Sequence, residues 1–211
     1  MRNLEDEIVL ITGAGKGSGR LLAKAFAERG AVVAANDISP INVEQVVEEI
    51  NQQGGRAKVY IEDVAKKVGV QNLINQVEDD FGRIDILINH AAVEPNMRIL
   101  EMDEWDWHRV LDVNLTGAFL MTQSAGRVMR AQGQGVIINI FTADQDSVKN
   151  ARAEPHQGRA AFVASMQGLE AFTRQAAREL NLHGIQVYAV EKTGAAITEK
   201  VLVLLDGMEQ Q

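Results

Sequence analysis

The sequence predicts an α/β fold in which a doubly wound parallel sheet carries helices on both faces. Short apolar runs alternate along the 211 residues with segments whose apolar residues recur at helical spacing. A glycine-rich turn, Thr12 to Gly19, joins the first apolar run to the first helical segment. There is no internal repeat and no linker, so we expect one domain over residues 1–211. Strands that alternate with helices pair in parallel, because each helix crosses over the sheet.

The first half of the chain is predicted to hold four strands separated by three helices. The second helix begins at Ser39-Pro40, which is a helix-start signal, and is closed by Gly54-Gly55. The third helix ends at Phe81-Gly82. The fourth strand is apolar enough to be buried on both faces. The predicted strands are residues 8–11, 31–37, 57–61 and 84–89, and the first helix is residues 20–29.

The second half is predicted to hold two long helical regions, one from about 103 to 130 and one from about 159 to 182. The tail, 197–211, is ambiguous at this level. Helical spacing of its apolar residues favours a helix, and the alternative is a short strand over 201–205. The remaining predicted segments are strands at 136–141 and 185–190 and a polar loop at 144–158.

Composition and charge exclude several classes of function. The formal net charge of −8 argues against nucleic acid and anionic membrane surfaces as partners. There is no cysteine, so disulfides and thiol chemistry are excluded, and no metal site is predicted. The N-terminal segment is acidic and lacks the apolar stretch of a signal peptide, and no apolar run is long enough to span a bilayer. We therefore expect a cytoplasmic protein.

The glycine-rich turn has the composition of a phosphate cradle. Glycines allow the backbone to approach a diphosphate closely, and the following helix presents free N–H groups at its positive end. An acidic residue, Asp37, ends the second predicted strand and follows Gly17 by 20 residues. That spacing is typical of the carboxylate that binds the ribose hydroxyl of a dinucleotide. The turn and Asp37 together predict a dinucleotide-binding site.

These motifs are similar to those of the short-chain dehydrogenase/reductase family over nearly the whole chain. The family's TGxxxGxG turn is present at Thr12 to Gly19, its adenine-side pair as Asp63-Val64, and its helix asparagine as Asn114. The resemblance implies a Rossmann-type fold that binds NAD(H) in preference to NADP(H), because the Asp37 carboxylate would repel a 2′-phosphate. Lys16 favours the opposite preference, since a basic residue in the turn can bind a phosphate. The implied cofactor-binding residues are Gly13, Gly15, Lys16, Gly17, Ser18, Gly19, Asp37, Ile38, Asp63, Val64, Asn89, Ala91 and Ala92.

Two motifs depart from the family's pattern, and the second departure, at Thr142, is tolerable. The Asn-Asn-Ala-Gly motif reads Asn89-His90-Ala91-Ala92, which puts a methyl group where the family has glycine near the cofactor. We interpret His90 as a structural residue at a strand end. The position of the family's catalytic serine falls on Thr142, which keeps a hydroxyl that could hold a substrate carbonyl. Asn114 and Thr142 are therefore the expected remnants of the catalytic machinery.

The Tyr-x-x-x-Lys motif, in contrast, is lost. Phe162 and Met166 occupy its two positions, where the family's tyrosine transfers the substrate proton and its lysine lowers the pKa of that tyrosine and holds the nicotinamide ribose. Phenylalanine has no proton to transfer, and methionine has no charge. Lys149 and His156 lie on the loop before Phe162, and we favour a solvated loop histidine over a catalytic His156.

The end of the chain also differs from the family's pattern. Glu191-Lys192-Thr193-Gly194 replaces the Pro-Gly turn after the sixth strand, and few residues follow for a substrate lid or a seventh strand. Family members commonly pair through two long helices, here about 103–130 and 159–182. A missing seventh strand would remove the second common contact, so we expect a homodimer rather than a tetramer.

Three functions follow from these residues, in order of preference. The first is an NAD(H)-binding relative of the oxidoreductases with impaired or absent hydride transfer, which acts as a regulatory or partner subunit. The second is an active NAD-dependent oxidoreductase on an alcohol or carbonyl substrate, whose substitute proton donor is His156 or a water held by Thr142 and Asn114. The third, a scaffold that binds no nucleotide, is motivated only by Ala92 and the lost lysine.

Overall fold

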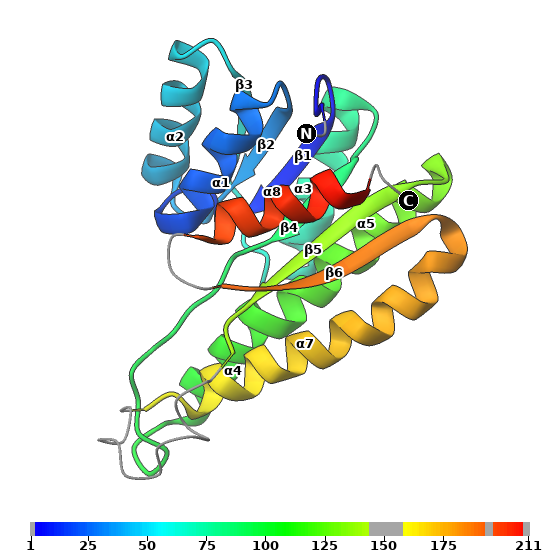
Figure 1. Ribbon diagram of the computed structural model, residues 1–211. Coiled ribbons are helices and arrows are strands. Elements are labelled where there is room, and N and C mark those ends of the chain that lie inside the picture. Colours follow the sequence, from blue (N-terminus) through cyan, green and yellow to red (C-terminus); the bar gives the residue numbers. More distant parts are fainter. Residues whose placement is uncertain (1–2, 144–157, 193–195, 209–211) are drawn as a thin grey trace.

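The computed structural model describes residues 3–143, 158–192 and 196–208, which form one parallel sheet between two layers of helices (Figure 1). The strand order is β3-β2-β1-β4-β5-β6, and every pairing is parallel. The order of the strands reverses between β1 and β4, which leaves a crevice at the carboxyl ends of these two strands. The strands are β1 (Ile8–Thr12), β2 (Val32–Asn36), β3 (Arg56–Tyr60), β4 (Ile86–Asn89), β5 (Gly135–Phe141) and β6 (Ile185–Glu191).

The helices divide between the two faces of the sheet (Figure 1). Val9 and Ile11 of β1 point into a core shared with α1, α2 and α8, whereas Leu10 points into the core under α3, α5 and α7. This alternation is what a strand buried on both faces requires. The helices that flank the sheet are α1 (Gly17–Glu28), α2 (Pro40–Gln52), α3 (Lys67–Phe81), α5 (Ala118–Gln132), α7 (Ala160–Leu180) and α8 (Ile197–Met208).

The fourth strand begins at Ile86, so the predicted start at Ile84 is wrong. The Asp85 carboxylate accepts a hydrogen bond from the backbone N–H of Ile8 at 2.8 Å, and the Gln132 side chain accepts one from the N–H of Ile84 at 3.0 Å. Side chains therefore bond the N–H groups of Ile8 and Ile84, whereas the backbone groups of Asp85 itself still bond Ile8 O and Val136 N. Apolar patterning does not reveal this competition.

The long helical region predicted over 103–130 is not one regular helix. It consists of α4 (Glu104–Leu111), a π-helical segment (Asp112–Gly117) and α5. The π-helical turn contains Asn114, and it brings Gly117 so close that an added Cβ would lie 3.0 Å from the carbonyl oxygen of Val64. Irregular turns of this kind are frequent at functional sites.

The tail is helical over Ile197–Met208, so the favoured interpretation is confirmed and the alternative strand is wrong. Val201 and Leu205 are fully buried in the core beside α1, and Asp206 pairs with Arg29 of the chain segment that follows α1 at 2.8 Å. Of the predicted polar loop 144–158, residues 144–157 lie outside the described part of the chain, as do 193–195.

Candidate functional site

A groove of about 410 Å³ lies at the carboxyl ends of the parallel strands. Its walls come from the glycine turn after β1, from the ends of β2 and β3, and from the segment after β4. This is the switch point of the sheet, where open α/β folds bind their ligands. Ten of the predicted cofactor-binding residues line it: Gly13, Lys16, Gly17, Ser18, Asp37, Ile38, Asp63, Val64, Ala91 and Ala92.

Two glycines of the turn, Gly13 and Gly19, pack closely at the end of β4 and leave no room for a side chain. Gly13 has a φ of +67°, and a Cβ there would lie 2.8 Å from Cα of Ala91. A Cβ on Gly19 would lie 2.0 Å from the carbonyl oxygen of Gly13. The helix that follows begins at Gly17 without a side-chain hydrogen bond from its N-cap residue Lys16. Its first N–H groups therefore have no capping side chain and suit an anion.

Asp37 ties the turn to the end of β2. One carboxylate oxygen accepts a hydrogen bond from the N–H of Gly15 at 2.9 Å, and the other accepts one from the N–H of Ser39 at 2.9 Å. Gly15 thus contributes by holding Asp37 and does not line the groove. Each carboxylate oxygen keeps a further lone pair for a hydroxyl donor. The arrangement fits the ribose of a dinucleotide.

His90 joins the end of β4 to the same turn. Its Nδ1 lies 3.2 Å from the carbonyl oxygen of Gly13, and its Nε2 lies 2.8 Å from Oγ of Ser18. Burial lowers the pKa of His90 to about 4, and the positive charge of Lys192 adds to this shift. The imidazole is therefore neutral at physiological pH. The interpretation of His90 as a structural residue did not include its place in the wall of the groove.

A second cavity of about 340 Å³ adjoins the groove and shares His90, Ala92, Val93 and Lys192 with it. Thr142, which follows β5, lies in its wall opposite the start of α7. Phe162 and Met166, which lie one turn apart on α7, also line this cavity. Both volumes lie within the range of small-molecule sites.

Comparison with known proteins identifies the family. The family model described as short chain dehydrogenase matches residues 7–201. The chain belongs to the short-chain dehydrogenase family.

Individual relatives agree with this assignment. An uncharacterized oxidoreductase of Thermotoga maritima is 38% identical over 188 residues, which cover 89% of this chain and 71% of that protein. The 3-oxoacyl-[acyl-carrier-protein] reductase FabG of Staphylococcus epidermidis is 36% identical over 203 residues, 96% of this chain and 80% of that protein.

Solved structures show the same fold. A metagenomic short-chain oxidoreductase in complex with NADP has a TM-score of 0.86 and 27% identity, covering 96% of this chain and 92% of that one. An NAD⁺-bound xylitol dehydrogenase has a TM-score of 0.81 and 28% identity, covering 95% of this chain and 76% of that one. Family membership therefore supports binding of a nicotinamide dinucleotide.

The two positions on α7 predicted from sequence to correspond to the Tyr-x-x-x-Lys pair, Phe162 and Met166, are apolar and packed. Phe162 is 6% exposed and Met166 is 2% exposed, in a cluster with Val110 and Ala161. Arg159 lies over the Phe162 ring at 5.0 Å from the ring centroid, and its Nε pairs with Glu94 at 2.6 Å. Its charge is therefore balanced, and α7 presents no hydroxyl or amine at these two positions.

Asn114 does not line the cavity that contains Thr142. Its side-chain oxygen accepts from the N–H of Val93 at 2.8 Å, and its amide nitrogen donates to Val93 O and to Ser165 Oγ, both at 3.0 Å. It is 1% exposed, so its side chain holds the segment after β4 against α7. Asn89 is also buried, and it donates to Asn139 of β5 at 2.7 Å.

Lys192 is the site residue that sequence reasoning missed. Its N–H donates to the carbonyl oxygen of Phe141 at 2.7 Å, which continues the β5–β6 ladder past the last residue of β6. Its side chain lines both the groove and the adjoining cavity, and its ammonium makes no hydrogen bond or ion pair with a described residue. The sequence feature that could have identified Lys192 is its position directly after a parallel strand.

Neither tyrosine of the chain reaches the site. Lys149 and His156 fall outside the described residues. Tyr60 donates its hydroxyl to Asp80 at 2.6 Å, and burial together with that carboxylate raises the pKa of Tyr60 well above its usual range. Neither Tyr60 nor Tyr188 lines the groove or the cavity. Within 3–143, 158–192 and 196–208, no cluster of three metal-ligating side chains occurs, and no helix there is long and apolar enough to cross a membrane.

The contact between Gly19 and Gly13 gives a direct test of the groove. We expect Gly19→Ala to displace the turn, to lower the free energy of unfolding and to weaken NADH binding at least about tenfold, because the added methyl group overlaps a backbone carbonyl. Gly207→Ala is the matched control, since open space surrounds Gly207 in the last turn of α8. It should stabilise the protein by up to about 0.5 kcal/mol. Urea unfolding measures the free energy of unfolding, and fluorescence titration measures the affinity for NADH. Unchanged NADH affinity in Gly19→Ala would contradict the assignment.

Proposed function

We propose that this chain is an NAD(H)-binding short-chain dehydrogenase relative with little or no hydride transfer, which acts as a regulatory or partner subunit. The observation that carries the proposal is the apolar pair on α7. Phe162 and Met166 line the cavity where the family has a proton donor and a cation, and both are buried in an apolar cluster. Loss of general acid–base help costs about 10²–10⁴ in rate.

The cofactor preference rests on the turn and Asp37. The groove has the volume, the close backbone approach at Gly13 and the uncapped helix start that a diphosphate requires. The Asp37 carboxylate lines it and would repel the 2′-phosphate of NADP(H). Relatives do not decide this preference, because the two solved structures hold NADP in one case and NAD⁺ in the other.

A fluorescence titration with NADH and NADPH tests the preference. We expect NADH to bind at least about tenfold more tightly than NADPH, because of charge repulsion at Asp37. Asp37→Asn should reduce the difference, and Asp37→Arg should reverse it. Asp79→Arg, at an exposed position on α3, is the matched charge control and should leave the ratio unchanged. Equal affinities in the unaltered protein would contradict the preference, and no binding of either would favour the scaffold.

A second candidate function is an active reductase with a substitute proton donor. It is favoured by two observations, the reductase names of several relatives and the position of Lys192 in the cavity wall. Bound NADH would supply a hydride to a carbonyl carbon. The Lys192 ammonium could then donate a proton to the carbonyl oxygen, while the Thr142 hydroxyl holds that oxygen. Because every polar atom of the Asn114 side chain is bonded to Val93 or Ser165, a water held by Asn114 has weak support.

Rebuilding the family's pair separates the two functions. With acetoacetyl-coenzyme A as carbonyl probe, we expect the unaltered protein to consume NADH at the background rate. The double variant Phe162→Tyr/Met166→Lys should exceed it by about 10²–10⁴, because it restores a proton donor and a cation. Met166→Lys alone is the control, since it adds the charge without the donor, and thermal unfolding checks that each variant folds. NADH turnover by the unaltered protein that Lys192→Met abolishes would instead establish the second function.

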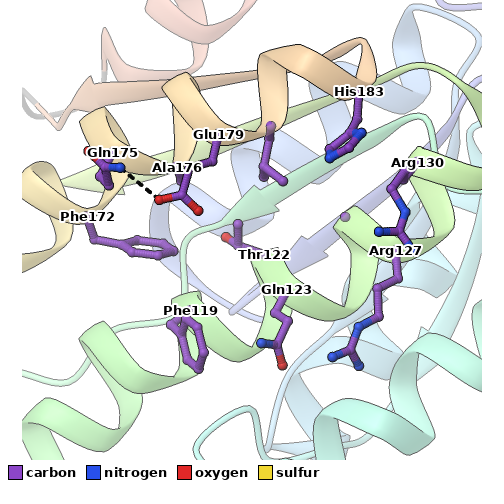
Figure 2. Close-up of a pocket in the computed structure, with 12 residues that line it drawn as sticks. Phe119, Thr122, Gln123, Arg127, Arg130, Phe172, Gln175, Ala176, Glu179 and His183 are labelled. Atoms are coloured by element: carbon purple, nitrogen blue, oxygen red, sulfur yellow. Dashed lines mark hydrogen bonds between the residues drawn. The ribbon is translucent and has the colours of Figure 1, made fainter.

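We also propose that the chain forms a homodimer through the long helices α5 and α7. A hollow of about 410 Å³ lies between these two helices and is lined by residues of both (Figure 2). Phe119 and Phe172 meet edge to face across it at 6.0 Å, and Phe119 is 40% exposed. Arg127 and Arg130 line one side, and Glu179 lines the other. Charges of both signs on one face suit a two-fold interface, which must be complementary to itself.

Light scattering tests the assembly. We expect the mass of a dimer for the unaltered protein and of a monomer for Gly126→Arg, because the long side chain would fill the hollow between α5 and α7. Val203→Arg on α8 is the control, since Val203 is 62% exposed on the opposite face of the sheet. A tetramer, or a dimer that persists in Gly126→Arg, would contradict this interface.

A further inference from the structure

The hydrogen bonds of His90 determine the direction of the Ser18 hydroxyl. The carbonyl oxygen of Gly13 can only accept, so Nδ1 of His90 donates to it. In a neutral imidazole the other nitrogen then carries no proton. Nε2 therefore accepts the hydrogen of the Ser18 hydroxyl at 2.8 Å.

This direction is unfavourable for a diphosphate. Ser18 lies in the first turn of α1 and lines the groove. With its hydrogen directed at His90, the Ser18 oxygen presents only lone pairs to the groove. The oxygens of a diphosphate also carry only lone pairs. Ser18 can therefore donate to a diphosphate only if its bond to the neutral His90 is broken.

Protonation of His90 removes the conflict. In an imidazolium both ring nitrogens donate, so Nδ1 keeps its bond to Gly13 and Nε2 donates to the Ser18 oxygen. The hydroxyl hydrogen of Ser18 is then free to point into the groove. The same serine can accept from His90 and donate to an anion at once.

Burial, together with the charges around His90, keeps the ring neutral until an anion arrives. Burial and the Lys192 charge lower the pKa of His90, and the Asp37 charge opposes them weakly. Lys16, on the glycine turn, also lines the groove. Arg20 of α1 forms an ion pair with Glu49 at 2.5 Å. A diphosphate beside Ser18 would add two negative charges next to the ring, and nearby negative charge favours the imidazolium.

We propose that His90 is a positioning residue for the dinucleotide diphosphate, and that it takes up one proton when the diphosphate binds. The proposal rests on the proposed nucleotide-binding function. In this proposal the protonation state of His90 decides whether the Ser18 hydroxyl donates its hydrogen to His90 or to the diphosphate. Since the bound state then holds more protons than the free state, affinity rises as pH falls. As pH falls, the affinity begins to rise near the pKa that His90 has in the bound state. It stops rising near pH 4, which is the pKa of His90 in the free protein.

Calorimetric titration with ADP-ribose between about pH 5 and pH 7.5 tests this uptake. ADP-ribose carries the diphosphate and adenosine of the cofactor, and it tolerates acid that destroys NADH. We expect the dissociation constant to fall as pH falls, by at most about tenfold per pH unit, as one proton requires. Repeating the titration in buffers of different ionisation enthalpy measures the proton uptake directly, with an expected value between zero and one.

His90→Gln provides the decisive variant, because glutamine can reach Ser18 and does not titrate. Its affinity should be independent of pH, and its proton uptake should be zero. A purely structural role would instead lower the affinity equally at every pH and leave the uptake unchanged. His108→Gln is the matched control, since His108 is an exposed residue of α4 away from the turn, and it should keep the full pH dependence.

Each remaining outcome is informative. Binding without pH dependence in the unaltered protein would overturn the proton uptake and leave the nucleotide site intact. Uptake that persists in His90→Gln would overturn the role of His90 and assign the proton to another group of the protein. Absence of ADP-ribose binding at every pH would overturn the nucleotide-binding function itself, together with this proposal.

Discussion

The close contact between the glycine turn and the end of β4 is the constraint on which the functional end of this molecule depends. The hydroxyl of Thr12, the last residue of β1, accepts hydrogen bonds from the N–H groups of both His90 and Ala91 at 3.1 Å. Gly13 and Gly19 leave no space for a side chain between these segments. β1 and β4 are therefore held together at their carboxyl ends, at the point where the strand order reverses.

The rest of the groove follows from that contact. Helix α1 starts directly after the turn, so its uncapped N–H groups face the space that the turn leaves open. Asp37 reaches the turn from β2 and bonds the N–H of Gly15, which sets the distance between the turn and the second strand. A binding surface for an anion and a ribose thus comes from backbone geometry and one carboxylate. It does not depend on the residues that carry the family's chemistry.

That independence explains how the fold and the groove are compatible with apolar side chains at both Phe162 and Met166 of α7. Phe162 and Met166 fill their positions with apolar volume, in contact with Val110 and Ala161. Cores tolerate such replacements when volume and polarity pattern are preserved. The cavity is lined by Thr142 after β5 and Lys192 after β6, so its polar groups come from segments that follow strands, whereas α7 contributes only Phe162 and Met166. Function belongs to such a site rather than to the fold that carries it.

The sequence by itself determined the α/β class and the six strands, and it favoured a helical tail and predicted a dinucleotide site at the glycine turn. Periodicity and glycine spacing are local properties, and they are sufficient for these conclusions. The boundary of β4 and the π-helical turn at Asn114 were not predictable, because each depends on a side chain that bonds a backbone group distant in sequence.

The tertiary structure alone decided which polar side chains meet. Asn114 was expected beside Thr142, and the structure instead uses it to hold Val93 and Ser165. Lys192 and His90 lie about a hundred residues apart in the chain and share the walls of both cavities. Local sequence shows that a residue follows a strand, but strand order decides which strand ends become neighbours. In this protein that order brings β6 beside β5 and β4 beside β1, and so places an ammonium group and an imidazole at one site.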